Sequence, residues 1–299
     1  MKAAYKIGVD GGGSKTECIL IDEAGAIVRR QVAPASNPNV VGPEQARLVV
    51  TDALCALIAH QPGEILQTSL FMAGNRPFWQ EFAGSLTGFG RANSADDSLP
   101  VLELATDGGA GLVLHSGTGS FVAARAPDGA IHYAGGLGWR FGDPGSGYDL
   151  GRRAIARGLL ELQGWAPPSR LGATIRDSTP LGDLADAAAL TKYFYGEPTP
   201  NQKIAALAPA VLRLAAEGDY TAHLLILESA GELLDLAVRV AAKLFPDTAA
   251  DELRAGLSGP ILTHAVVQEA LVPRSPLALV ALTEPPIEGV RRLLVRSAV

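Results

Sequence analysis

The sequence has little cysteine and no long apolar run, and each shortage excludes a class of protein. Its 299 residues include two cysteines, Cys18 and Cys55, which are too few for a disulfide framework and form no CxxC metal motif. Both lie in apolar surroundings, so we expect both to be buried. No apolar run reaches the roughly 18 residues that a membrane span needs, and the N-terminus shows no signal-peptide pattern. These shortages predict a soluble, cytoplasmic protein.

The chain also lacks basic clusters. It has 25 Lys and Arg against 31 Asp and Glu, and no basic run longer than short pairs such as Arg152-Arg153. This balance predicts neither a nucleic-acid partner nor a membrane partner. The five histidines are scattered without an HExxH motif, so we predict no zinc site. What the chain does have is 47% hydrophobic residues, enough to build one large or two ordinary domains.

A glycine-rich loop separates two apolar segments at the start of the chain, in "KIGVDGGGSKTECILID" (residues 6–22). It differs from a Walker A loop, because Ser14 stands where the lysine is required and a β-favouring segment follows instead of a helix. There is no GxGxxG motif for a Rossmann site. The pattern predicts a strand–loop–strand hairpin whose backbone amides suit a phosphate, with an ordinary hairpin turn as the alternative.

The same pattern returns a little over one hundred residues later, in "GLVLHSGTGSFVAARAPDGAIHYAG" (residues 111–135). An apolar strand again meets a Gly/Ser/Thr loop, and both copies continue through a turn containing Gly-Ala-Ile into a third strand. Two copies of one β-meander suggest two similarly folded domains, with the phosphates of a nucleotide between the two loops. The predicted phosphate ligands are Gly11, Gly12, Gly13, Ser14, Lys15 and Thr16 in the first loop and Gly117, Thr118, Gly119 and Ser120 in the second.

Apolar periodicity and turn signals predict the elements around the two meanders. Helices are expected over 42–60 and 76–86, and buried strands over 68–74 and 101–107. The first domain would then read βββαβαβ. A helical region follows the second meander, and late strands are expected in 253–259 and 276–283.

Asp10, directly before the first glycines, would repel a phosphate unless a cation lay between them. Magnesium is the expected cation, because it binds through one or two carboxylates together with phosphate oxygens. The alternative is an Asx turn in which Asp10 only caps the loop.

Three motifs in order, "DGGGSKT" (10–16), "SGTGS" (116–120) and "GGLGWRFGDPGSGYDLGR" (135–152), resemble the N-acetylglucosamine kinase and BadF/BadG-type ATPase family. That family belongs to the actin-like, hexokinase-like ATPase superfamily. The resemblance implies an α/β fold of two ribonuclease-H-like domains with a nucleotide cleft between them. The domains would cover 1–106 and 107–284, the second with a helical insertion, and a C-terminal helix at about 285–299 would pack back on the first.

The resemblance also implies roles for single residues. Asp107, in "ELATDGG", would be the general base that accepts the proton of a sugar hydroxyl; the alternative is a turn aspartate before two glycines. Relatives place a short helix between this base and the second loop, with its N-terminus at the carboxylate. Only residues 108–115 separate Asp107 from Ser116, so we expect that helix to be missing.

Further residues are assigned to the sugar and the adenosine by the same resemblance. Asn37, Gly136 and Asp143 would contact the sugar, and Gly259 the adenosine. Asn37 could instead initiate a turn before Pro38, and Asp143 could cap a helix. Leu137 stands where relatives have the tryptophan of the sugar pocket, so the acetamido preference does not carry over.

The motifs favour an ATP- and Mg²⁺-dependent kinase for the 6-hydroxyl of an amino-hexose of the N-acetylglucosamine or glucosamine type. A non-catalytic nucleotide or sugar sensor of the same fold is the first alternative. The second is an ATPase activator of a 2-hydroxyacyl-CoA dehydratase, although Cys18 and Cys55 do not lie where such activators hold their iron–sulfur cluster. A small-molecule sugar is the expected partner, and a homodimer is one compatible oligomeric state.

Overall fold

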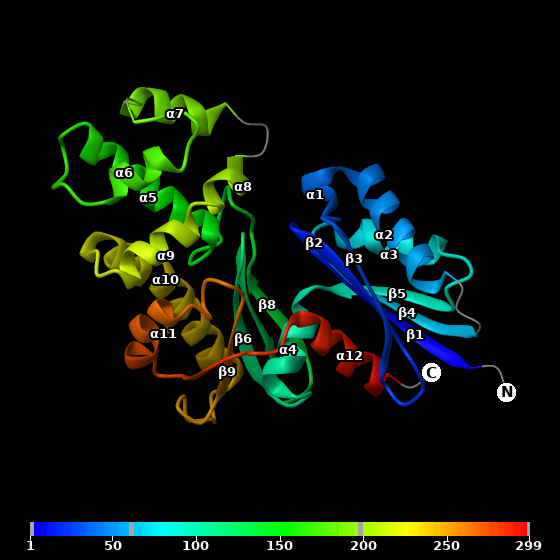
Figure 1. The fold of residues 1–299 in the computed structure, drawn as a ribbon. Helices are drawn as coiled ribbons and strands as arrows, with labels where there is room; N and C mark the ends of the chain where they lie inside the picture. Colours follow the sequence, from blue (N-terminus) through cyan, green and yellow to red (C-terminus); the bar gives the residue numbers. More distant parts are fainter. Residues whose placement is uncertain (1–2, 60–62, 184, 197–199, 298–299) are drawn as a thin grey trace. The chain divides into compact units, whose positions relative to one another are not determined.

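The computed structural model describes residues 3–59, 63–183, 185–196 and 200–297 and divides the chain into two compact units. The first unit comprises Met1–Gly108 and Thr283–Val299, and the second comprises Gly109–Leu282. The sequence analysis placed the boundary between residues 106 and 107. The first and last segments of the chain, blue and red in Figure 1, therefore share a unit, and each unit is described here by itself.

The described residues of the first unit form a five-stranded sheet of order β3-β2-β1-β4-β5. Its strands are β1 (Ala4–Gly11), β2 (Lys15–Ile21), β3 (Ile27–Pro34), β4 (Glu64–Met72) and β5 (Arg91–Asp96). β1, β2 and β3 form the predicted antiparallel meander, and β4 and β5 run parallel to β1. Because β1, β3, β4 and β5 point in one direction, their carboxyl ends meet at one edge of the sheet, which we call the first carboxyl edge.

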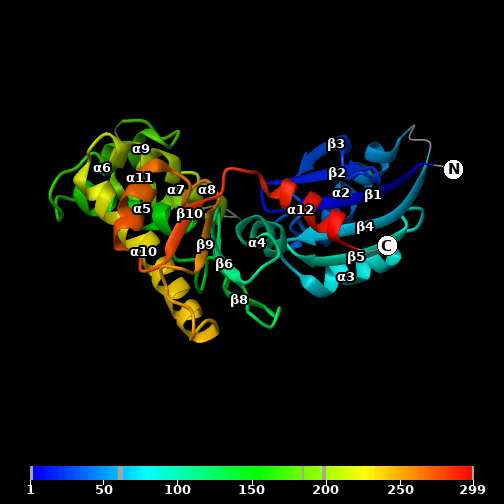
Figure 2. The same ribbon diagram turned by 90° about the horizontal axis from the view of Figure 1, so that it is seen from below.

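Helices cover both faces of this sheet (Figure 2). They are α1 (Pro38–Val41), α2 (Pro43–Ile58), α3 (Arg76–Ser85), α4 (Ser98–Thr106) and α12 (Pro286–Arg296). Alternate residues of β2 face opposite cores: Cys18 and Leu20 join the core under α2 and α3, whereas Ile19 and Ile21 pack with α12. A Cβ on Gly8 would lie 2.2 Å from Val290 Cγ1, so a glycine here allows α12 to approach β1. Residues 298–299 of the expected C-terminal helix lie outside the described residues.

The prediction of a buried strand over 101–107 is wrong, because Ser98–Thr106 is helix α4. The segment has a helical start, with Asp97 before Ser98 and Pro100 in the first turn. Val101, Leu102 and Ala105 are buried at helical spacing. The strand that completes the sheet is β5, with the sequence RANSAD. This sequence has no apolar pattern, and the strand is stabilised by its parallel pairing with β4.

The described residues of the second unit repeat this arrangement in a five-stranded sheet of order β10-β9-β6-β7-β8. Its strands are β6 (Gly111–Ser116), β7 (Ser120–Arg125), β8 (Ile131–Gly135), β9 (Arg254–Ser258) and β10 (Ala278–Ala281). β6, β7 and β8 are the second antiparallel meander, and β9 and β10 run parallel to β6. The carboxyl ends of β6, β8, β9 and β10 meet at the second carboxyl edge. The duplication expected from the sequence is therefore present in the strand order of both sheets.

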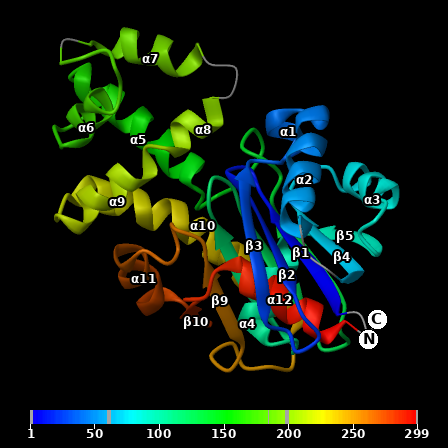
Figure 3. The same cartoon turned by 45° about the vertical axis from the view of Figure 1, so that its right-hand side comes forward.

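Most helices of the second unit lie between β8 and β9 in the chain. They are α5 (Gly147–Leu162), α6 (Leu171–Asp177), α7 (Ala187–Tyr195), α8 (Pro200–Ala205), α9 (Ala208–Ala216) and α10 (Tyr220–Leu244), followed after β9 by α11 (Ala265–Leu271) and the short η1 (Val272–Arg274). α10, the long helix drawn in dark yellow in Figure 3, packs against β6 and β7 through residues such as Ile226 and Leu233. This core fixes the strand whose end carries the second glycine loop.

Two further expectations concern burial and the membrane. Cys18 is fully buried, but Cys55 is exposed on α2, so the expectation that both cysteines are buried is wrong for Cys55. The apolar neighbours of Cys55 in the sequence, Leu54 and Leu57, lie on the buried face of an amphipathic helix, and Cys55 lies on the other face. Among the described helices, none has the length and apolar character of a bilayer-crossing segment.

Candidate active site

The first glycine loop lies at the first carboxyl edge and is held by the segments beside it. The backbone N–H of Ser36 donates to Gly12 O (3.2 Å) and that of Ala73 donates to Gly11 O (2.8 Å). The buried hydroxyl of Thr16 donates to Ser36 Oγ at 2.7 Å. These bonds fasten the loop to the segments after β3 and β4 and fix its backbone.

The glycines of this loop differ in what surrounds them. A Cβ on Gly11 would lie 2.2 Å from Met72 Cε, so Gly11 is required by packing within the unit. A Cβ on Gly12 would meet only Lys15 O at 3.6 Å, and one on Gly13 would meet no described heavy atom within 4 Å beyond its chain neighbours. Neither Gly12 nor Gly13 has a positive φ. The fold of the unit therefore does not require glycine at either position, whereas a ligand close to the backbone would.

The charged residues after the loop are already paired. Lys15 Nζ donates to Glu17 Oε2 at 2.9 Å, and Arg30 also binds the carboxylate of Glu17. Glu17 is almost fully buried, whereas the side chain of Lys15 is 60% exposed. The Lys15 ammonium can therefore reach a ligand only in competition with Glu17. Ser14 is exposed at the tip of the hairpin.

Two partly buried carboxylates lie at the first carboxyl edge, Asp10 at the end of β1 and Asp97 directly after β5. Burial raises the pKa of Asp10 to about 7, and the negative charges of Asp97 and Glu17 add to the rise, against an opposite effect of Lys15. Burial likewise raises the pKa of Asp97 to about 6, together with the charge of Asp96, although the backbone N–H groups of Asp97 and Ser98 lower it. Neighbouring carboxylates with raised pKa values favour a proton or a cation between them.

This pair fits magnesium but does not form a complete cage for a metal. The described part of the chain holds no cluster of three or more His, Cys, Asp and Glu side chains positioned to bind a metal ion. Magnesium keeps several waters and uses phosphate oxygens beside one or two protein carboxylates, so two carboxylates next to a glycine loop are sufficient. Asp10 is thus a residue able to hold a metal–phosphate group here, with the carboxyl of Asp97 beside it.

Asp107 occupies a different environment from the one expected for a base. It ends α4 in the left-handed conformation (φ 50°), and its side chain is 67% exposed. Its Oδ1 lies 2.7 Å from Arg296 Nη2 and 3.9 Å from Arg292 Nη1, both on α12. Arg296 also binds the buried Glu103. Asp107 therefore takes part in an ion-paired contact between two helices of the first unit.

Residues 108–115 contain no helix, as expected. A short helix, α4, lies instead directly before Asp107. The resemblance calls for a strand, an aspartate at its end, and a short helix whose N-terminus lies at that aspartate. β5, Asp97 and α4 form this sequence of elements, and Asp97 is the N-cap residue of α4. Asp107 lies at the C-terminal end of the same helix, so its carboxylate is not at the helix N-terminus.

Asn37 lies at the same edge, in the segment after β3. Its Oδ1 accepts the backbone N–H of Asn39 at 2.9 Å and caps the short helix α1, so the turn-forming alternative describes part of its role. A Cβ on Gly74, which has φ +97°, would lie 2.4 Å from Asn37 Oδ1. Glycine at position 74, after β4, therefore leaves room for the amide of Asn37. The cap uses only the oxygen of that amide.

The second glycine loop is fastened in the second unit by its own set of contacts. The hydroxyls of Ser116 and Ser120 donate to Gly145 O (2.5 Å) and Pro144 O (2.6 Å). The backbone N–H of Gly147 donates to Gly117 O at 2.8 Å. Thr118 is exposed at the tip. The loop is therefore supported by the start of α5, the segment that the third motif encodes.

Asp143 lies beneath this loop. It is buried, has a positive φ of 63°, and accepts the backbone N–H of Gly138 at 3.2 Å. Burial raises its pKa, and the Gly138 hydrogen bond opposes the rise. A Cβ on Gly119 would lie 2.9 Å from Asp143 Oδ2, so glycine leaves room for the carboxylate. Asp143 does not cap α5, because Ser146 does.

At two other predicted ligand positions, Gly136 and Gly259, the local backbone conformation and packing require glycine. Gly136 has φ +60° and its Cβ would lie 2.3 Å from Tyr133 Oη. Gly259 has φ +87° and its Cβ would lie 2.2 Å from Ser116 O. The segment after β9 thus approaches the end of β6 more closely than any other residue would permit.

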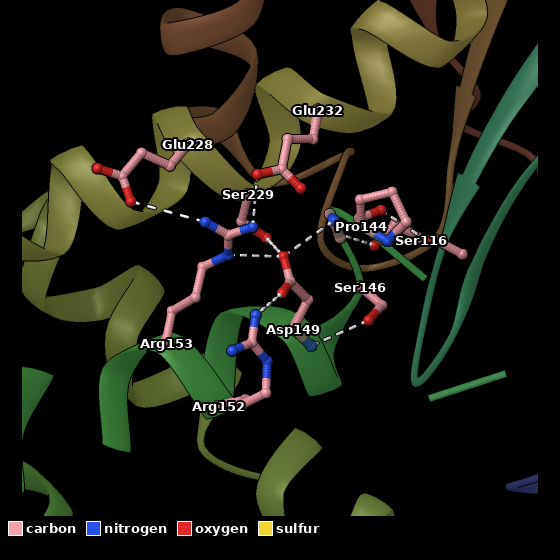
Figure 4. A network of polar contacts seen from close by, with 11 residues as sticks. Ser116, Pro144, Ser146, Asp149, Arg152, Arg153, Glu228, Ser229 and Glu232 are labelled. Atoms are coloured by element: carbon pink, nitrogen blue, oxygen red, sulfur yellow. Dashed lines mark hydrogen bonds and ion pairs between the residues drawn. The ribbon is translucent and has the colours of Figure 1, made fainter. Parts of the chain in front are cut away.

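An ion network surrounds the buried carboxylate of Asp149 at the start of α5 (Figure 4). The carboxylate of Asp149 accepts from Ser229 Oγ (2.7 Å), Arg152 Nη2 (2.8 Å) and Arg153 Nε (2.9 Å). Burial alone would raise the pKa of Asp149, but the Ser229 hydrogen bond and the two arginines outweigh it, so the pKa lies below its ordinary value. Arg153 continues to Glu232 at 2.7 Å. The network anchors α5 to α10, and the sequence analysis did not single it out.

Comparison with known proteins decides the family. The family described as the BadF/BadG/BcrA/BcrD ATPase family matches residues 7–272. The chain belongs to this family. The BadF/BadG resemblance read from the three motifs is thereby confirmed.

Individual relatives of this BadF/BadG family member carry kinase names. It is 27% identical to an N-acetyl-D-glucosamine kinase of Dictyostelium discoideum, over 80% of this chain and 79% of the relative. It is 27% identical to an N-acetylmuramic acid/N-acetylglucosamine kinase of Clostridium acetobutylicum, over 77% and 76%. A Chromobacterium violaceum structure, provisionally named N-acetylglucosamine kinase, matches 98% of this chain and 99% of that chain with a TM-score of 0.80 and 30% identity.

The fold prediction is confirmed as well. A glucokinase of the ROK family from Streptomyces griseus shares the fold at a TM-score of 0.59 and 14% identity, covering 96% of this chain and 97% of that one. The α/β class with two hexokinase-like domains thus holds for this BadF/BadG family member. The roles of the individual site residues remain predictions.

The sequence reasoning missed Asp97 and Asp149. Asp97 had a signal, because "SADDSLP" joins a helix-capping residue type to a proline in the first turn. Asp149 had none, because Ser229, to which it is hydrogen-bonded, lies 80 residues away in the sequence.

The open space beside Gly13 leads to a test of the first loop. Gly13→Val should leave the melting temperature within about 2 °C of wild type, while raising the KM for MgATP at least tenfold by blocking close approach to the backbone. Gly84→Val on α3 is the matched control, because a Cβ on Gly84 also meets nothing within 4 Å. An unchanged KM for Gly13→Val would remove the loop from nucleotide binding.

Proposed function

We propose that this protein is an ATP- and magnesium-dependent sugar kinase that phosphorylates the 6-hydroxyl of an amino-hexose of the N-acetylglucosamine or glucosamine type. The observation that carries the proposal is the Asp10–Asp97 pair beside the first glycine loop. Packing within the unit does not require glycine at positions 12 and 13 of that loop, whereas a ligand close to the backbone would. The kinase names of the relatives support the same reaction class.

We assign the general base to Asp97 instead of Asp107. Asp97 directly follows β5, is partly buried and is the N-cap residue of α4. Its pKa is about 6, so it is ionised at neutral pH and able to accept a proton. Asp107 is exposed and paired with Arg296. An exposed carboxylate that is already paired with an arginine is not held in a position to contact a substrate hydroxyl.

In the proposed reaction the Asp97 carboxylate takes the proton of the sugar hydroxyl as that oxygen bonds to the γ-phosphorus. The bond from the γ-phosphorus to the bridging oxygen breaks, and ADP leaves. Asp10 would hold the magnesium, which when bound neutralises phosphate charge. Both glycine loops would donate backbone N–H groups to phosphate oxygens. Asn37, Gly136 and Asp143 would bind sugar hydroxyls, and Gly259 would bound the adenosine site.

The main alternative, a non-catalytic sensor, rested on a missing helix before the second loop. With Asp97 as the proposed base, α4 lies between the base and the second loop, and the proposal does not need a further helix. ATP consumption is consistent with a cytoplasmic enzyme, and we include that location in the proposal. The proposal also includes a homodimer, and light scattering would test it by measuring the molar mass in solution.

The proposal is tested by measuring ADP release from MgATP with and without a panel of hexoses and amino sugars. We expect ADP release only with an amino-hexose, and a phosphate ester at oxygen 6 by phosphorus NMR of the product. ADP release that is independent of sugar would instead support an ATPase. Nucleotide binding without turnover would support the sensor.

A further inference from the structure

A histidine on β6 stands directly before the second glycine loop, and the reaction described above does not use it. His115 Nδ1 lies 3.1 Å from Ser258 Oγ, and Ser258 is its register partner on β9. On the other side the ring stacks on Phe121 of β7, with the ring centroids 4.9 Å apart and the planes 20° from parallel. Neighbours on both adjacent strands therefore fix the orientation of the imidazole.

The hydrogen bond to Ser258 also decides which ring nitrogen can donate. Burial lowers the pKa of His115 to about 4, so the ring is neutral at neutral pH and has one N–H donor and one acceptor nitrogen. Among the residues that the structure describes, the Ser258 hydroxyl has no hydrogen-bond partner besides His115 Nδ1. The hydroxyl is therefore best used as the donor to Nδ1, and we assign the ring hydrogen to Nε2.

The Nε2 atom borders an open space at the second glycine loop. A Cβ on Gly117 would lie 3.6 Å from His115 Nε2 and would meet no other described heavy atom within 4 Å beyond its chain neighbours. Gly117 has no positive φ, so neither its backbone nor its packing requires glycine. Nε2 has no hydrogen-bond partner within the described part of the chain, and the ring is partly exposed. A donor without an acceptor thus lies beside a loop whose backbone amides suit a phosphate.

We propose that His115 is a nucleotide-binding residue whose Nε2–H donates a hydrogen bond to a phosphate oxygen held at the second glycine loop. The inference rests on the proposed function, because it takes the ligand of this loop to be a nucleotide. Binding can nevertheless be measured without a sugar and without turnover. Ser258 and Phe121 are positioning residues, because they act on the ligand only through the imidazole ring.

Two amide variants separate the roles of the two ring nitrogens. The amide of glutamine in His115→Gln reaches the place of Nε2, whereas the amide of asparagine in His115→Asn reaches only the place of Nδ1. Calorimetry measures the binding of ADP and of adenosine to both. His115→Asn should weaken ADP binding about tenfold and His115→Gln by less than about threefold, since the lost bond is one to a charged group. Adenosine carries no phosphate, so its affinity should stay the same in both.

A measurement on the wild-type protein tests the same contact without a substitution, so it holds even where a variant does not fold. In protein labelled with nitrogen-15 histidine, NMR should show the hydrogen of His115 on Nε2. The Nε2 resonance should shift when ADP is added and should not shift with adenosine. His132→Asn is the matched control, because it makes the same change on the exposed side of β8 and should leave ADP affinity within about twofold.

The possible outcomes separate this contact from a structural role and from the kinase itself. Equal weakening of ADP and adenosine binding, or weaker ADP binding in His115→Gln than in His115→Asn, would overturn the inference and leave His115 as a support for Ser258. An Nε2 resonance that does not respond to ADP would overturn it as well. Absence of sugar-dependent ADP release would overturn the kinase, whereas the comparison of ADP with adenosine would still decide the role of His115.

Discussion

Asp97→Asn is expected to lower kcat for sugar phosphorylation by about 10²- to 10⁴-fold, the range of a lost general base. Asparagine keeps the shape of the side chain at the start of α4 but cannot accept the proton. Because the Asp97 pKa is about 6, kcat/KM of the wild type should fall as the pH drops below about 6, where the carboxyl becomes protonated. Steady-state ADP release as a function of pH measures both effects.

Asp107→Asn is the matched control, because it makes the same chemical change at the other end of the same helix. It weakens an exposed ion pair with Arg296, which contributes roughly 0–1 kcal/mol to stability, and kcat should stay within about threefold of wild type. The reverse result, a silent Asp97→Asn and an inactive Asp107→Asn, would restore the assignment first made from the sequence.

Asp10→Asn is expected to change activity and stability in opposite directions. Removing the carboxylate that would hold magnesium should lower kcat/KM by at least about 100-fold. The metal-free protein should nevertheless become more stable at pH 8, because burial and the neighbouring charge of Asp97 disfavour an ionised Asp10. A gain on the order of 1–3 kcal/mol would raise the melting temperature by several degrees.

The sign of this effect follows from the raised pKa. A carboxyl whose pKa rises from 3.8 in the unfolded chain to about 7 in the folded chain binds more protons when folded. Its contribution to stability is complete below about pH 4 and is lost as the pH rises through 7. The difference in melting temperature between Asp10→Asn and wild type should therefore grow from pH 5 to pH 8 in the presence of EDTA. A constant difference would mean that Asp10 titrates normally.

The two meanders could be predicted from the sequence because their signals are local. An apolar strand, a glycine loop and a second apolar strand lie within about 17 residues, and the second copy resembles the first. Strand β5 could not be predicted in this way. Its residues Arg91, Asn93 and Asp96 have low β-propensity, and the strand exists because β4 offers a paired edge.

The sequence pointed to Asp107 and not to Asp97 as the base for the same physical reason. Without β5, the apolar run at 101–106 was the last candidate strand, and Asp107 followed it. A short apolar run is compatible with a buried strand and with a buried helix, and periodicity does not separate them. The ion pair of Asp107 with Arg296 could not be predicted from the sequence either, because Arg296 lies 189 residues further along the chain.

The packing of α12 on the first sheet can form only at the end of synthesis, because α12 is C-terminal to the whole second unit. The core of the first unit requires Ile287, Val290 and Leu294, which leave the ribosome after every residue of the second unit. The second unit, Gly109–Leu282, is continuous and can complete its core while translation proceeds. The face of the first sheet around Ile19 and Ile21 stays exposed until α12 has been synthesised. In the nascent chain, the N-terminal strands are therefore the segment at greatest risk of aggregation.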